Sequence, residues 1–133
     1  MAIVTNRTTS DSASTASFEV VATGVLIVGE SDTVVDVSSL IGAAGDGTER
    51  VRVTHVTALV ASSRNTAAPR VVLSWDGSDD FLTLPEGTTS LKLACNPKDD
   101  ATGDISFTSP VNTPFTLFLT VEKIRGYPLS IAN

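Results

Sequence analysis

The sequence predicts an all-β protein, and within that class an antiparallel β-sandwich with the jelly roll as its candidate topology. Val, Thr and Ser dominate the 133 residues, and the restricted χ1 of β-branched side chains favours pleated strands. Short extended segments alternate with turn clusters at a spacing of roughly ten residues, as in sandwiches and barrels. No stretch carries a convincing helical period, and 38–45 could form at most a turn of helix.

The strands are expected where apolar residues alternate between turn signals. In chain order these segments are 18–28 (interrupted at Gly24), 33–40, 50–61, 71–75, 81–84, 91–93, 105–107 and 115–121. Within 50–61 the alternation changes phase between Val53 and Val56. An extra residue in a strand has this effect, so we expect a β-bulge near His55.

The last of these segments is apolar on both faces. Phe115, Leu117, Leu119 and Val121 share one face, and Phe118 and Ile124 lie on the other. Two apolar faces indicate a strand that is covered on both sides, either at the centre of the sandwich or at a subunit contact.

By composition the chain divides into a polar N-terminal arm at 1–17, a β-sandwich domain at 18–125 and a C-terminal tail at 126–133. The arm has too few apolar residues to fold alone, so we expect it to lie on its own domain or on a neighbouring subunit. The tail alternates apolar residues and needs a sheet edge, its own or a neighbour's. The predicted partner-binding residues of these two segments are Ile3, Val4, Tyr127, Leu129 and Ile131.

Charge and composition argue against several classes of function. The net charge of −6 and the scattered basic residues disfavour a nucleic-acid partner. The longest apolar run, 20–29, is too short to span a membrane, and no secretory signal is expected. Cys95 and His55 are each the only residue of their type, so no disulfide, cysteine–zinc cluster or histidine metal pair is expected within the chain. Because a nucleophile-elbow motif is also lacking, we expect neither enzyme activity nor a cofactor.

The stretch WDGSDD at 75–80 holds the only tryptophan beside a group of carboxylates. Asp76, Asp79 and Asp80 are candidate ligands for Ca²⁺, which takes several oxygen ligands. The same residues are typical of a solvated hairpin turn, because Asp caps its own backbone and Asp-Gly favours tight turns; this is the preferred interpretation. Trp75 is expected to anchor the core, with a sugar-stacking platform as the alternative.

The stretches VVATGVLIVGESDTVVDVSSLIG and RVVLSWDGSDDFLTLPEGTTSLKL, together with the Ser/Thr-rich start, resemble small structural proteins of tailed bacteriophages. Short virion proteins of that group often carry a strand–WDG–LxLPxG–strand segment like 73–87. The resemblance covers residues 18–95 in general sequence character and is not a match to a specific motif. It implies a β-sandwich virion component, in the first place a head decoration (cement) protein on the capsid surface.

Such a protein would be made in the host cytoplasm, form a homo-oligomer such as a trimer, and bind the shell built by the major capsid protein. Two alternatives stay open from the sequence. One is a carbohydrate-binding or adhesion module whose site contains Trp75, Asp76, Asp79 and Asp80. The other is a major shell or tail subunit of the virion.

Overall fold

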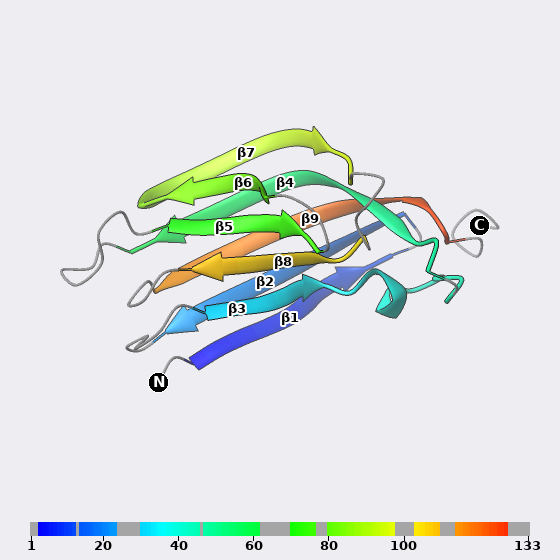
Figure 1. Ribbon diagram of the computed structural model, residues 1–133, viewed down its shortest axis with the longest axis horizontal. Coiled ribbons are helices and arrows are strands. Elements are labelled where there is room, and N and C mark those ends of the chain that lie inside the picture. The colour runs from blue at the N-terminus through cyan, green and yellow to red at the C-terminus, as the bar shows by residue number, and fades with distance from the viewer. Residues whose placement is uncertain are drawn as a thin grey trace.

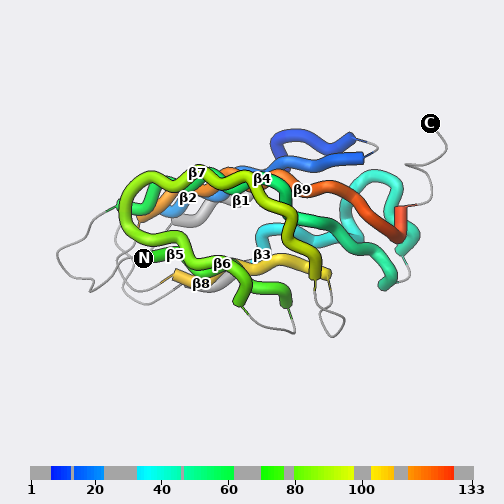
Figure 2. Tube along the Cα trace, turned by 90° about the horizontal axis from the view of Figure 1, so that it is seen from above, coloured from blue at the N-terminus to red at the C-terminus, as the bar shows by residue number. Residues whose placement is uncertain are grey.

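The structure is a computed structural model that describes residues 3–12, 14–23, 30–45, 47–61, 70–76, 80–97, 103–109 and 114–127, with only the backbone described at 3–6, 23 and 30–32. In these ranges the strands form two antiparallel sheets that pack face to face, as Figures 1 and 2 show. The larger sheet has the order β1 (Ile3–Asp11), β2 (Thr15–Thr23), β9 (Phe115–Arg125), β4 (Arg50–Val60) and β7 (Gly87–Cys95). The smaller sheet has the order β3 (Glu30–Val35), β8 (Ile105–Ser109), β5 (Arg70–Trp75) and β6 (Asp80–Pro85). A single turn of 3₁₀-helix, η1 (Val37–Ser39), follows β3.

The predicted all-β sandwich is confirmed, and its strand order is that of a jelly roll. β2 pairs with β9, β3 with β8, β4 with β7 and β5 with β6. The chain therefore forms a long antiparallel ribbon with β2–β5 in one half and β6–β9 in the other. Rolling the ribbon up places β9 beside β4 and β8 beside β5, which is the jelly-roll arrangement. β1 is an additional edge strand beside β2.

Most of the predicted N-terminal arm lies on its own domain, one of the two places expected for it. Within 1–17, residues Ile3–Asp11 form β1, which pairs with β2 from Ile3↔Thr23 to Asp11↔Ala16. β2 itself begins at Thr15, so a boundary at residue 17 falls inside a strand. The arm was expected because the segment lacks apolar residues, but an edge strand does not require them. Its backbone hydrogen bonds hold it to the sheet, and its threonines favour the extended conformation.

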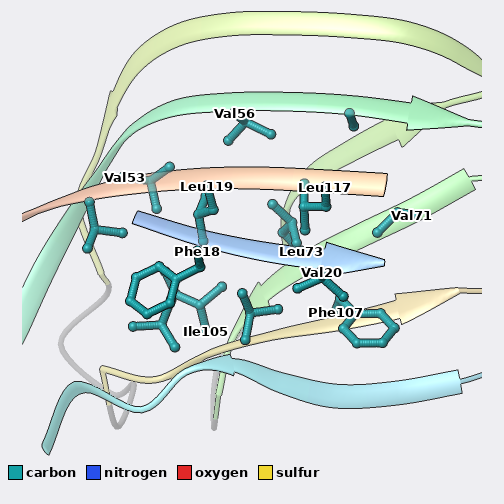
Figure 3. Packing of buried hydrophobic residues seen from close by; sticks show 14 of the residues in the cluster. Phe18, Val20, Val53, Val56, Val71, Leu73, Ile105, Phe107, Leu117 and Leu119 are labelled. Atoms are coloured by element: carbon teal, nitrogen blue, oxygen red, sulfur yellow. The ribbon is translucent and has the colours of Figure 1, made fainter. Parts of the chain in front are cut away.

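The core lies between the two sheets, as Figure 3 shows for its central residues. β9 is the central strand of the larger sheet, and the four side chains predicted to share its inward face are buried. Its opposite face is open in the described structure, where Phe118 is 45% and Ile124 38% exposed. β9 is therefore central, as predicted, but only one of its two apolar faces is covered.

The β-bulge predicted near His55 is confirmed. The register of β4 shifts between Val53 and His55 in its pairing with both neighbouring strands, β7 and β9. The extra residue returns Val56, Ala58 and Val60 to the buried face that Val51 and Val53 occupy before it. It also sets His55, Thr57 and Leu59 on the opposite, exposed face.

Candidate docking face

The larger sheet presents one face to solvent, the side of the upper layer in Figure 2 that points away from the smaller sheet. We call it the outer face. The alternation of β4 and β9 assigns Thr57, Leu59, Thr116 and Phe118 to it, because the residues between them are buried. Strand register adds Glu19 and Val21 from β2 and Ser90 from β7.

Three apolar side chains lie near one another in the middle of the outer face. Phe118 is paired with Thr57, and Leu59 with Thr116, so Phe118 and Leu59 are diagonal neighbours on adjacent strands. Val21 pairs with Thr116 from the other side. Directly opposed and diagonal side chains on one sheet face lie within contact range of each other. We call Val21, Leu59 and Phe118 the apolar centre; Leu59 is 56% exposed, the largest fraction among the three.

Polar residues surround the apolar centre. Thr57 Oγ1 and Ser90 Oγ lie 3.3 Å apart, and Ser17 Oγ and Thr120 Oγ1 3.2 Å apart. Ion pairs join Arg7 Nε to Glu19 Oε1 at 2.8 Å and Arg52 Nη1 to Glu122 Oε1 at 3.1 Å. An apolar centre with a polar, partly charged rim is the usual anatomy of a protein–protein interface.

The charge of the outer face differs from that of the whole chain. Arg7, Arg52 and Lys92 lie on it together with Glu19 and Glu122, whereas the chain has 9 basic and 15 acidic residues. The outer face is therefore less acidic than the rest of the protein. A second copy, or another acidic protein, meets less electrostatic repulsion here than elsewhere on the surface.

Asp11, Lys123 and Tyr127 are buried together at the end of the sandwich where the β1–β2 turn, η1 and the end of β9 meet, and we call them the buried polar cluster. The Tyr127 side chain is 3% exposed, and its hydroxyl donates to the Val37 carbonyl over 2.7 Å. Burial, followed by the negative charge of Glu49, raises the pKa of Tyr127 well above that of a free tyrosine. Tyr127 was predicted to bind a partner; in the described structure its buried side chain contacts its own domain.

The other predicted partner-binding residues are only partly described. Ile3 and Val4 lie in β1, where their backbones are paired with Thr23 and Ala22. Leu129 and Ile131 fall outside the described residues.

The residues of WDGSDD are distributed between the core and the surface. Trp75 is 2% exposed and stacks on Phe81 with ring centroids 4.9 Å apart, which confirms it as a core anchor. Asp76 and Asp80 are exposed, and Asp79 is outside the described residues. In the part of the chain that the structure describes, no three metal-ligating side chains come together. A sugar-stacking role would need an accessible ring, so the burial of Trp75 weighs against the carbohydrate-binding alternative.

Sequence reasoning placed Phe118 on the outer face but missed Leu59 as its neighbour. The signal for Leu59 was present, since the phase change at His55 fixes which of the following residues face outward. The contact between Lys123 Nζ and Asp11 Oδ1 in the buried polar cluster was not predicted, because the two residues are 112 apart in the sequence and no local pattern connects them.

The comparisons with known proteins leave the family open. No protein-family model and no curated protein matches the sequence. Among the described residues, none of the helical segments is long and apolar enough to cross a membrane.

Proposed function

We propose that the protein is a non-enzymatic structural subunit of a phage virion, a head decoration protein that binds the assembled shell through its outer face. The observation that carries this proposal is the apolar centre, which lies exposed on the central strands of a sheet. Neighbouring strands hold these side chains in a fixed arrangement, so binding costs less conformational entropy than it would on a mobile loop.

The jelly-roll fold is compatible with a decoration protein but does not distinguish this function from others. Jelly rolls occur in viral capsid domains and in lectins, and a fold by itself does not define a function. The likeness of 18–95 to short virion proteins favours the first of these groups. The burial of Trp75 argues against the second, because the ring proposed to stack on a sugar is inside the core.

Shell stabilisation follows from the binding itself. A protein that binds only the assembled shell lowers the free energy of that state by mass action. A homo-oligomer, such as a trimer, would contact several shell subunits at once and gain further from multivalency. Light scattering of the purified protein measures this oligomeric state.

The test is co-sedimentation of the purified protein with phage heads that lack it, taken from a phage in which the gene for this chain has been deleted. The informative variant combines Leu59→Asp with Phe118→Asp, which puts two charges into the apolar centre. The matched control is Thr83→Asp, an exposed position on the outward side of the smaller sheet.

We expect the wild type and the control to sediment with the heads and the double variant to stay in the supernatant. A wild type that does not sediment overturns the decoration function. A double variant that binds as well as the control overturns the assignment of the outer face. The number of copies per head separates a decoration protein from a major shell subunit.

A further inference from the structure

The buried polar cluster contains a lysine and an aspartate from opposite ends of the chain. Lys123, near the end of β9, has a side chain that is 0% exposed, and the Asp11 side chain at the end of β1 is 14% exposed. Their Nζ and Oδ1 atoms are 2.6 Å apart. The Tyr127 ring covers the nitrogen with its centroid at 5.3 Å. An amine and a carboxyl group are thus held in contact in a site from which most water is excluded.

The hydrogen bonds of Lys123 define where its reactive electron pair would point. Besides Asp11 Oδ1, Nζ donates to the carbonyl oxygens of Ser12 at 2.6 Å and Ile41 at 2.7 Å. If one proton passes from Nζ to Oδ1, the two remaining N–H groups match these two carbonyls. The lone pair then faces the Asp11 carboxyl group, and a small rotation turns it from Oδ1 toward Cγ. Amide formation needs this neutral pair, because the nitrogen attacks only through an unprotonated lone pair.

The other oxygen of Asp11 is also held. Its Oδ2 accepts a hydrogen bond from the backbone N–H of Ile41 at 2.8 Å. When a nucleophile adds to a carboxyl group, negative charge develops on the oxygen that stays bound to carbon. A fixed backbone N–H at hydrogen-bond distance stabilises that charge, as in an oxyanion hole.

We propose that Lys123 and Asp11 condense to form an intramolecular amide, an isopeptide bond between the first and the last strand. The neutral Nζ attacks Cγ of the protonated carboxyl group, and the N–C bond forms while Oδ2 takes up negative charge beside the Ile41 N–H. The C–Oδ1 bond then breaks, and Oδ1 leaves as water with its own proton and one from Nζ. One water is released, and neither an oxidant nor a further reactant is needed. Fixed contact between the two groups replaces the catalyst, because proximity of this kind gives high effective molarities.

The bond would secure one edge of the larger sheet. In the described structure β1 is an edge strand with β2 as its neighbour. Lys123 belongs to β9, on the far side of β2, so the amide would fasten the end of β1 across an intervening strand. It would also close a loop that contains most of the chain, and long loops lose the most entropy in the unfolded state. This inference does not depend on the proposed function.

Intact mass of the purified full-length protein under denaturing conditions tests the proposal. We expect the wild type to be lighter than its sequence mass by one water molecule, and Lys123→Arg and Asp11→Ala to have their full masses. Lys92→Arg, at an exposed lysine of β7, is the matched control and should still lose water. A full wild-type mass after prolonged incubation at neutral pH overturns the proposal, as does an equal loss of water in Lys123→Arg.

Peptide mapping of the wild type gives a result that does not depend on whether the variants fold. Trypsin cannot cut after an acylated lysine, so digestion should join the peptide 8–50 to the peptide 99–125, with Lys123 uncut inside it. Fragmentation must place the link on Asp11 and Lys123. Separate peptides 8–50 and 99–123, or a link at other residues, contradict the proposal.

Discussion

Tyr127 donates its hydroxyl hydrogen to the carbonyl oxygen of Val37 over 2.7 Å, although 90 residues separate the two. Val37 lies in η1, and the adjoining Gly126 carbonyl accepts from the backbone N–H of Ala44 at 2.8 Å. The chain that leaves β9 is therefore attached to two loops of its own domain. These contacts make Tyr127 part of the core of its own domain.

Replacing Tyr127 with Phe should destabilise the domain while leaving its fold intact. The variant keeps the ring but removes the donor, so that the Val37 carbonyl loses this partner in a buried site. We expect a loss of about 1–2 kcal/mol in the free energy of unfolding, the usual range for a buried group left without its hydrogen bond. Urea unfolding at neutral pH measures it, and equal midpoints for the two proteins would contradict the assigned bond.

The raised pKa of Tyr127 predicts a specific alkaline response. A folded-state pKa above the unfolded value of about 10 means that the folded protein retains the phenol proton, so ionisation opposes folding. The stabilising contribution of the Tyr127 hydroxyl is complete below about pH 10, and it is lost as the pH rises further, through the folded-state pKa. The stability difference between wild type and Tyr127→Phe should therefore shrink above about pH 10. Because Tyr127 is the only tyrosine, its absorbance change reports the same titration directly.

Gly126 and Gly45 form a matched pair for testing how closely the end of β9 packs. Their φ angles are nearly equal, +80° and +78°, so alanine brings similar backbone strain at both, about 1–2 kcal/mol. A Cβ at Gly126 would lie 2.4 Å from the Cα of Glu49, whereas one at Gly45 meets nothing within 4 Å. We expect Gly126→Ala to be clearly more destabilising than Gly45→Ala in thermal unfolding. Equal losses of stability in the two variants would mean that backbone strain alone causes both.

Asp104 should make the domain less stable at neutral pH than in mild acid. Burial raises its pKa, and the neighbouring charges of Asp36 and Asp76 add to this effect. With a folded-state pKa above the unfolded value, the stabilising contribution is present at low pH and is lost as the pH rises through the folded value. Asp104→Asn keeps an oxygen that can accept from the backbone N–H of Val37, now 2.9 Å from Asp104 Oδ1.

We therefore expect Asp104→Asn to unfold at a higher urea concentration than the wild type at pH 7. The advantage should disappear as the pH falls below about 4, where the wild-type carboxyl is protonated in both states. An advantage that is independent of pH would show that the carboxyl charge is not its cause.

The parts of the fold that sequence could predict are those with a local periodic signal. The change of phase around His55 and the alternation of β9 depend on side chains two residues apart, and both were read correctly. β1 gave no such signal, since its polar side chains lie at a sheet edge and only backbone pairing defines it. The contact of Asp11 with Lys123 depends on the closure of the whole roll, which no window of the sequence contains.

A truncation that removes residues 128–133 tests the tail without disturbing the core, because it keeps Tyr127 and its hydrogen bond to Val37. Leu129 and Ile131 alternate in the sequence as residues of an added strand do, and they were predicted to bind a partner. We expect the truncated protein to unfold at the wild-type midpoint but to bind phage heads less, in the same sedimentation assay. Deleting 126–133 instead, which removes Tyr127 as well, should lower the midpoint and serves as the control for damage to the core. Undiminished binding after the shorter deletion would refute the role of Leu129 and Ile131 and leave the outer face as the sole docking surface proposed.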